Sequence, residues 1–424
     1  MPPRSHNAWV SATALSIAAA HGAYLLLRPR SGTITATPVP AARYFAAADV
    51  ARARAYERPQ LRLHAAGALL HAAGLAAGVR SRRTSPLSRR HPLAAAAGAA
   101  GLALALTAQS LPLAAAARRR ALAAGLATQS WRGWALDVGR AAAIGAGFAA
   151  AAGATGCLLV RRYGERWWLP AAAGSVGAAA LVSFAAPLLL DPIFNDFEPL
   201  ADGVLRDGLL DLARRAGVGV REVLVIDASR RTRALNAYVA GVGATRRVVL
   251  FDTLLERFGP AEVEVVVAHE LSHVRHRDVL RGLAFMAIVA APAARAAAAL
   301  AARLEQGAPD TGPSAPALAL GGGLVATLIG PLARRLSRAV ERRADSFALE
   351  LTGDPDAFIA FEQAIARTNL TDPEPPAWQM LLLATHPSAV ERIGIAAAYT
   401  AGARATPRPP RRLLRRTAGR RCRP

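Results

Sequence analysis

The sequence predicts a mainly α-helical membrane protein with about seven transmembrane helices and a small α+β domain outside the bilayer. Hydrophobic residues make up 53% of its 424 residues and charged residues only 19%, a composition typical of membrane proteins. Long uncharged stretches alternate with arginine-rich loops, and two stretches between them are polar enough to fold in water. These observations favour a multi-span helical protein over two ordinary soluble domains.

Six segments of 17 or more residues carry no formal charge, and each is long enough to cross ~30 Å of hydrocarbon as a helix. They are residues 5–27, 63–79, 91–117, 141–160, 167–190 and 311–333. A seventh, 282–302, is apolar apart from Arg295 and contains Pro292, which a spanning helix tolerates when neighbours satisfy the freed carbonyl. The sequence therefore predicts seven spans.

Two of these segments have alternative interpretations. Segment 63–79 is short and contains His64 and His71, so an interfacial or buried helix is the alternative there. Segment 5–27 follows Arg4 and resembles a signal peptide, but its apolar run is long for one. We therefore expect a retained anchor at the N-terminus.

The net charge of +23 comes from arginines that lie between the spans rather than in one stripe interleaved with aromatic residues. A nucleic-acid partner is therefore not expected. The arginines are more frequent in one set of alternating loops, which by the positive-inside rule places the polar domain on the cytoplasmic side of the cell membrane. The two cysteines, Cys157 and Cys422, cannot make a disulfide framework.

The chain divides into five parts. Residues 1–190 are predicted to form an N-terminal membrane domain with about five spans, and residues 282–333 form two further spans. The polar domain is split between residues 191–281 and 334–401. Residues 402–424 form a basic tail that we expect to be disordered and able to contact anionic lipid, with ribosomal or nucleic-acid contact as the alternative.

The first part of the polar domain contains three predicted strands and a helix. Runs of β-branched residues at 222–229 and 247–251, with a shorter run at 236–241, are typical of strands. Gly259 and Pro260 then open a helix with Glu262 and Glu264 in its first turns, as the helix dipole favours. That helix carries the most informative motif of the chain.

The motif is His269-Glu270-Leu271-Ser272-His273, which matches the pattern H-E-x-x-H. Two imidazoles four residues apart share one helix face and can converge on one cation. A carboxylate beside them can take a proton from metal-bound water, whose pKa zinc lowers towards ~7. The motif indicates one zinc ion per chain, and the alternative is a helix with two surface histidines.

A catalytic zinc site needs a third protein ligand, and Glu341 is the best candidate. It lies four residues before Asp345 in a predicted helix, so Asp345 suits a hydrogen bond to the distal nitrogen of a liganding histidine. His276 suits the third position less, because it lies about 10 Å of helix rise beyond His269. The alternative for residues 337–345 is an exposed helix with ordinary Arg–Glu pairs.

Six motifs in order resemble peptidase family M48, the integral-membrane zinc peptidases, and specifically the Ste24 or CaaX-protease type. They are P-I-F-N-D-F-E-P-L at 192–200, N-A-Y at 236–238, V-V-L-F-D-T-L-L at 248–255, H-E-L-S-H at 269–273, E-R-R-A-D at 341–345, and H-P-S at 386–388 with an arginine at 392. The resemblance is sharp from about residue 192 to 392, and it implies a zincin-like fold for the polar domain.

The resemblance assigns the metal-site roles directly. It implies that His269, His273 and Glu341 bind zinc, that Glu270 is the general base, and that Asp345 orients a liganding histidine. These assignments agree with the reading of the same residues from their spacing.

The resemblance also implies roles for residues outside the metal site. His386 and Arg392 would stabilise the transition state, whose oxyanion needs fixed donors. Asn236, Ala237 and Tyr238 would belong to an edge strand on which an extended substrate lies. The alternatives are a solvated loop histidine, a surface arginine and an ordinary buried strand.

Together these observations predict a membrane-embedded zinc metalloendopeptidase that acts on peptide or protein substrates, including membrane-associated ones. Two alternatives stay open. The first is a quality-control peptidase of the HtpX type, with the same chemistry and fewer spans. The second is a catalytically silent membrane scaffold or sensor that keeps the metal for structure. The sequence leaves the physiological substrate and the oligomeric state open.

Overall fold

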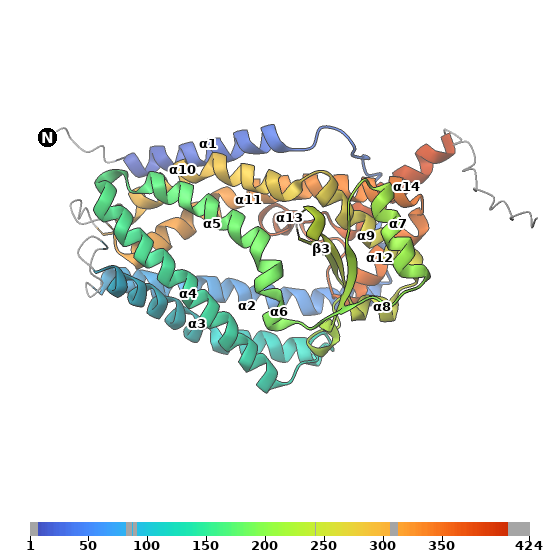
Figure 1. Ribbon diagram of the computed structural model, residues 1–424, viewed down its shortest axis with the longest axis horizontal. Helices are drawn as coiled ribbons and strands as arrows, with labels where there is room; N and C mark the ends of the chain where they lie inside the picture. The colour runs from blue at the N-terminus through green and yellow to red at the C-terminus, as the bar shows by residue number, and fades with distance from the viewer. Residues whose placement is uncertain (1–6, 82–86, 88–90, 242, 306–312, 406–424) are drawn as a thin grey trace, which may run out of the picture.

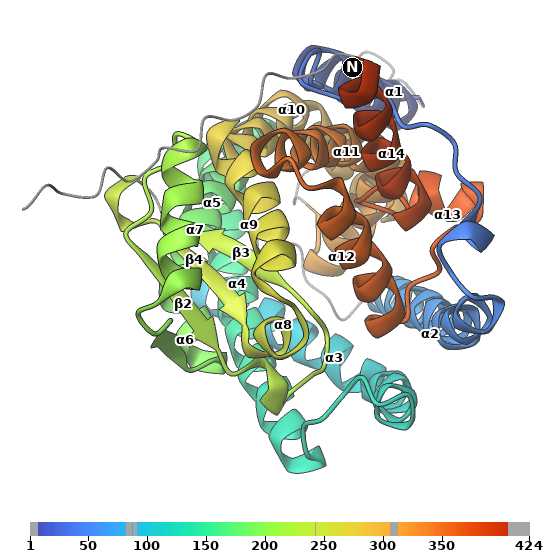
Figure 2. The same ribbon diagram turned by 90° about the vertical axis from the view of Figure 1, so that its right-hand side faces the viewer.

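The computed structural model describes residues 7–81, 87, 91–241, 243–305 and 313–405. The molecule is elongated, with long helices running side by side along its length (Figure 1). The strands and shorter helices gather at one end of these long helices, where the C-terminal segments also lie (Figures 1 and 2). Of the predicted basic tail, residues 402–424, the part after position 405 lies outside the described residues.

Within the described residues, six helices are long and apolar enough to cross a membrane. They are α1 (Ala8–Leu27), α3 (Pro92–Ala123), α4 (Trp131–Tyr163), α5 (Trp168–Leu189), α10 (Asp278–Leu304) and α11 (Ala315–Thr352). The prediction of a multi-span helical membrane protein is confirmed by these helices. They correspond to six of the seven expected spans.

The seventh expected span, residues 63–79, forms the C-terminal half of α2 (Ala47–Arg80) and is not among the six. Its two histidines and its glycines lower its hydropathy, while the N-terminal half of α2 is charged. The segment nevertheless packs along α3. Gln109 of α3 donates a hydrogen bond to the carbonyl of Leu70 over 3.2 Å. Nε2 of His71 lies 3.0 Å from the carbonyl of Leu106.

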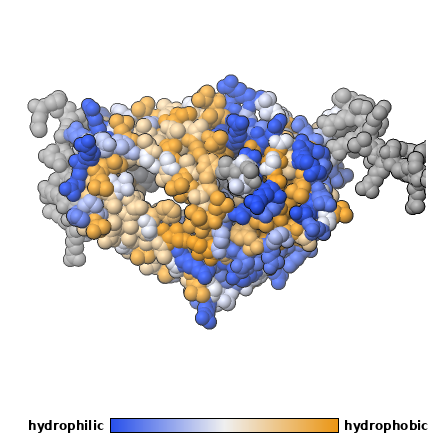
Figure 3. Space-filling model, viewed as in Figure 1, coloured by the Kyte–Doolittle hydropathy of each residue, from blue (hydrophilic) through white to orange (hydrophobic). Residues whose placement is uncertain are grey.

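Surface hydropathy divides the molecule in the same way. Hydrophobic side chains cover the middle of the face in Figure 3, over the spanning helices, and hydrophilic side chains gather at the two ends. A membrane-spanning body with two polar ends has this distribution.

One of these polar ends, called the polar end from here on, is built from a small sheet and short helices. The strands are β1 (Phe197–Pro199), β2 (Glu222–Ile226), β3 (Ala237–Ala240) and β4 (Arg247–Phe251), in the order β1-β2-β4-β3. Strands β2 and β4 are parallel, whereas β1 and β3 pair antiparallel with their neighbours. The three predicted strands are therefore confirmed, and β3 lies at an edge of the sheet.

The remaining elements surround this sheet. The helices are α6 (Asp191–Phe194), α7 (Val204–Arg215), α8 (Asp252–Arg257), α9 (Pro260–Arg275), α12 (Pro355–Thr368), α13 (Ala377–Leu382) and α14 (Ala389–Ala405), with short 3₁₀ turns η1 (Ala41–Arg43), η3 (Gly164–Arg166), η4 (Ala228–Arg230) and η5 (Gly243–Thr245). Helix α9 begins at Pro260, as predicted, and lies between the sheet and helices α11 and α12 (Figure 2).

The core of the polar end holds α9 in place. Fully buried Val223 and Val248 of the sheet, Val263 and Leu271 of α9, and Phe358 of α12 belong to one apolar cluster. Burial of such side chains stabilises the fold by about 1.5–3 kcal/mol each. Because the motif helix is packed on both sides, its histidines have fixed positions.

Two long helices carry the chain from the membrane into the site. The expected boundaries at 281/282 and 333/334 fall inside α10 and α11, both of which run unbroken through them. Glu341 and Asp345 lie on the same helix as the last span. The candidate site is therefore coupled directly to the membrane-spanning body.

Candidate metal centre

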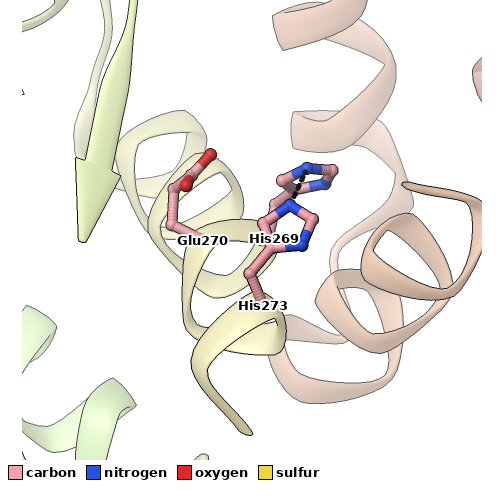
Figure 4. Close-up of side chains that lie close together, drawn as sticks. All are labelled: His269, Glu270 and His273. Carbon is pink, nitrogen blue, oxygen red and sulfur yellow. Dashed lines mark hydrogen bonds between the residues drawn. The ribbon is translucent and has the colours of Figure 1, made fainter. Parts of the chain in front are cut away.

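Helix α9 brings two imidazoles close together, with their ring planes at 79°. Val263, Val267 and Leu271 bury one side of the helix, and His269 is buried with them at 6% exposure. His273, one turn later, is partly exposed. The Nε2 atoms of His269 and His273 lie 3.2 Å apart, and Figure 4 shows the two rings side by side with these nitrogens directed at each other.

Glu341 of α11 approaches the same point. One of its oxygens lies 3.1 Å from Nε2 of His269, and the other lies 3.7 Å from Nε2 of His273. Ligands held about 2 Å from one tetrahedral ion are about 3.3 Å from each other. The three side chains predicted as ligands therefore meet at separations that fit one zinc ion, across 72 positions of sequence.

Glu270 is a second carboxylate near the two histidines, with an oxygen within 4.8 Å of their ring nitrogens. Its side chain lies to one side of the two rings rather than between them (Figure 4). Glu341 contacts both Nε2 atoms more closely. By these distances Glu341 is the better candidate for a third ligand, and Glu270 stays a candidate for proton transfer.

Two further carboxylates fix the orientation of the rings. Nδ1 of His269 donates to Oδ1 of Asp345 over 2.9 Å, and Nδ1 of His273 donates to Oδ2 of Asp278 over 3.2 Å. A histidine that donates through Nδ1 presents the lone pair of Nε2 to a metal. The sequence predicted the position of Asp345, whereas Asp278 is an addition from the structure.

The backbone conformation of Arg277 brings Asp278 close to His273 of the motif. Arg277, between α9 and α10, has a left-handed backbone with φ 55°, which turns the chain sharply after His276. Asp278 then starts α10, where it also contacts Arg281 and Arg343. His276 contacts Ser272 and Phe347 instead of the ligand cluster, as expected.

Arg392 and His386 occupy different positions around the cluster. Arg392 lies behind His269, where it binds both oxygens of buried Asp345 and lies 2.7 Å from an oxygen of Glu362. His386 lies at the open rim with 60% of its side chain exposed, and its Nε2 is 3.5 Å from Glu341. Of the two predicted oxyanion donors, His386 faces the open side, whereas Arg392 is already bound by two carboxylates.

Glu362 is a buried acid that the motifs do not reveal. It lies on α12 at 1% exposure, and its oxygen near Arg392 has no aligned hydrogen bond within the described part of the chain. The contact with Arg392 is therefore an ion pair alone. Its sequence signal was a charged residue on the apolar face formed by Phe358, Phe361 and Ile365.

The electrostatics of the cluster favour a positive ion. Burial opposes protonation of His269, but the carboxylates of Asp345 and Glu341 outweigh this effect and raise the pKa of His269 to about 10. Burial raises the pKa of Glu270 above its ordinary value, which suits an acid that accepts and returns protons. The site thus combines two imidazoles and acidic neighbours, the donor set that zinc prefers.

A cavity of about 480 Å³ opens onto the cluster. His269, Glu270 and His386 line its polar side, and Phe358 and Phe361 belong to its apolar side. Asn236, just before β3, also lines the cavity. The other two residues predicted to bind substrate lie along β3, where Ala237 is buried and Tyr238 donates a hydrogen bond to Asp191 over 3.0 Å.

Comparison with known proteins gives matches across this region. Residues 199–399 match Peptidase family M48. An uncharacterized metalloprotease, YhfN, of Bacillus subtilis is 32% identical over 244 residues, which is 55% of this chain and 57% of that protein. A protease HtpX homolog of Burkholderia thailandensis is 30% identical over 206 residues, 43% of this chain and 69% of that protein.

Two further matches concern prenyl proteases and the whole fold. CAAX prenyl protease 1 of Saccharomyces cerevisiae is 38% identical over 100 residues, 23% of this chain and 22% of that protein. The chain thus spans less than two thirds of the Bacillus and yeast relatives. The crystal structure of S. mikatae Ste24p superposes with a TM-score of 0.68 at 18% identity, covering 92% of this chain and 99% of that one.

Proposed function

Because the chain belongs to peptidase family M48 and folds like Ste24p, we propose that it is a membrane-embedded zinc endopeptidase with His269, His273 and Glu341 as metal ligands. The observation that carries the proposal is the convergence of these side chains from two helices, with separations of 3.1–3.7 Å. When bound, zinc would lower the pKa of water and polarise a peptide carbonyl.

The chain's own residues would supply the proton transfers. Glu270 takes a proton from the attacking water and gives it to the leaving amine, a role supported by its raised pKa and its place beside the rings. His386 donates to the developing oxyanion from the open rim. Arg392 holds Asp345, and through it His269, so it acts chiefly as a positioning residue.

An extended peptide would lie along β3. Strand β3 is an edge strand, and the cavity beside it is lined by Asn236, Glu270 and His386. A peptide paired with this edge would place its backbone near Glu270 and one side chain in the apolar part of the cavity. We place this site on the cytoplasmic side, because the arginine distribution of the loops favours that orientation.

Two substrate classes remain compatible with this chemistry. The Ste24p-like fold over 92% of the chain favours peptides delivered at the membrane, such as those that the name CAAX prenyl protease implies for the yeast relative. Misfolded membrane proteins are the second class, which a quality-control peptidase of the HtpX type would cleave, and the chain also matches an HtpX homolog. Incubation of the purified chain with both kinds of substrate separates the two classes.

The decisive experiment compares the wild type with Glu270→Gln. We expect zinc content to be equal in the two proteins, while peptide cleavage falls by about 10²–10⁴-fold in the variant. Glu264→Gln, on the same helix, is the matched control and should cleave normally. Absence of zinc from the wild type, or equal cleavage by Glu270→Gln, would refute the proposal, and a zinc-loaded wild type that cleaves nothing would favour the scaffold.

A further inference from the structure

A groove of about 940 Å³, which shares no lining residue with the cavity at the metal centre, lies beside the N-terminal half of α2 and the segment that leads into it. Its volume is in the range of about 300–1,000 Å³ found for small-ligand pockets. The segment before α2 contributes an apolar wall, which includes Pro40, Ala41 and Phe45, and α2 contributes a basic wall formed by Arg54, Arg58 and Arg62. Residues four apart share one face of a helix.

The charges of the groove are only partly compensated. Arg54 pairs with Asp372 over 2.7 Å, whereas Arg58 and Arg62 are exposed and have no ion-pair partner in the part of the chain that the structure describes. Glu374 is the acidic residue of the lining. Three arginines against Asp372 and Glu374 leave one net positive charge, and the two unpaired guanidinium groups favour an anionic ligand.

Contacts between α2 and α3 fix the depth of the groove relative to the spanning helices. Gln60 donates a hydrogen bond to the carbonyl of Ala117 over 3.1 Å, and Arg120 donates to the carbonyl of Ala55 over 3.0 Å. The basic wall is therefore level with the end of α3 where its uncharged run stops and three arginines follow.

Aromatic residues mark the same level. The guanidinium of Arg118 lies 5.2 Å and 5.6 Å from the ring centroids of Trp131 and Trp134. Tryptophan and arginine at the end of a span are typical of the headgroup region of a bilayer. Past Arg62, α2 continues as the uncharged segment 63–79. The groove thus opens where polar headgroups meet acyl chains.

We propose that this groove binds an anionic phospholipid. The phosphate contacts Arg58 and Arg62, the two arginines without an ion-pair partner among the described residues, and the acyl chains lie against the wall that contains Pro40 and Ala41. A soluble phosphate would use the arginines but not the apolar wall. The charge, the two-sided lining and the depth all favour a lipid, and the site is independent of the peptidase chemistry.

The test uses the full-length chain in detergent, with native mass spectrometry to measure retained phosphatidylglycerol and phosphatidylcholine of equal chain length. We expect the wild type to retain phosphatidylglycerol in preference. Arg58→Gln/Arg62→Gln should weaken this binding by about 25-fold, about fivefold for each arginine. Arg52→Gln/Arg132→Gln removes two exposed arginines outside the groove and should bind as the wild type does.

A second variant tests the shape of the groove. Ala51→Phe fills it without a change of charge and should also reduce retention of phosphatidylglycerol, while zinc content reports that each variant is folded. Unchanged retention in Arg58→Gln/Arg62→Gln overturns the proposal, as does an equal loss in the control pair, which would indicate diffuse charge attraction. Displacement of the lipid by millimolar inorganic phosphate would assign the groove to a soluble anion.

Discussion

Asp345 holds His269 from behind: Nδ1 of the imidazole lies 2.9 Å from an oxygen of the fully buried carboxylate, and Nε2 faces Glu341. Asp278 holds His273 in the same way from the start of the next helix. Each of the two candidate histidine ligands thus has its own acidic partner. Such partners fix the ring and its tautomer and raise the basicity of the liganding nitrogen.

The first prediction concerns these acidic partners. Asp345→Asn and Asp278→Asn should each weaken zinc affinity by about 10–100-fold, because an amide holds the imidazole less strongly than a carboxylate. Competition with a fluorescent chelator measures the change. Glu350→Gln, an exposed position on the same helix as Asp345, is the control. Affinity equal to that of the wild type in both variants would show that the two carboxylates serve only the fold.

The second prediction concerns Glu362 and the stability of the fold. Burial raises the pKa of this carboxyl to about 7, despite the nearby Arg392. Between the ordinary pKa and this value the native state binds more protons than the unfolded state, so the native state loses stability as pH rises through that window. Glu362→Gln removes this loss and should raise Tm relative to the wild type at pH 8.

The pH dependence gives this prediction its control. The difference in Tm between Glu362→Gln and the wild type should shrink towards pH 5, where the carboxyl is protonated in the native state. Asp356→Asn, exposed on the same helix, should show no such dependence. A lower Tm for Glu362→Gln at pH 8 would mean that the ion pair with Arg392 outweighs the cost of burial.

Much of the fold was predictable because its signals are local. Absence or near-absence of charge over about 20 residues identified six of the spans, and runs of β-branched residues identified β2 and β4. The continuity of α11 was not predictable in this way. The composition changes near residue 333, which suggests a boundary, but helical hydrogen bonds continue through it and carry Glu341 into the site.

The site was predictable where spacing encodes geometry. His269 and His273 share a helix face by their spacing, and Asp345 follows Glu341 by one turn. Asp278 and Glu362 depend on tertiary structure instead: one on the left-handed backbone of Arg277, the other on how α12 packs beside Arg392. No short pattern in a single sequence encodes such contacts.

The third prediction is that zinc binding releases a proton at neutral and mildly alkaline pH. The raised pKa of His269, about 10, means that the ring carries a proton that an incoming ion must displace. Affinity should therefore rise by about tenfold for each pH unit from pH 7 to 9. Calorimetry in buffers of different ionisation enthalpy counts the protons. Affinity that does not change with pH would contradict the protonated state of His269.

The fourth prediction tests substrate pairing with β3. The backbone carbonyl of Asn236 accepts a hydrogen bond from the N–H of Phe251 in β4. The backbone groups of Asn236 and Tyr238 therefore point towards β4, whereas those of Ala237 and Val239 point away from the sheet. A peptide bound at this edge should tolerate N-methylation at alternate amides only. Cleavage assays on a series of singly N-methylated peptides should therefore show KM rising with a period of two. A uniform response along the peptide would argue against strand pairing.

The fifth prediction concerns the seventh span. Leu69 is 72% exposed in the second half of α2, so it faces lipid if this segment crosses the bilayer and water if it does not. In a chain with Cys157→Ser and Cys422→Ser, Arg58→Cys should react with a charged maleimide in open membrane fragments, whereas Leu69→Cys should react at least tenfold more slowly, because thiolate formation is suppressed in hydrocarbon. Val204→Cys, at an 89% exposed position of α7, gives the rate of a freely accessible thiol. If Leu69→Cys reacts as fast as Val204→Cys, the second half of α2 lies in water and the chain crosses the membrane with six helices.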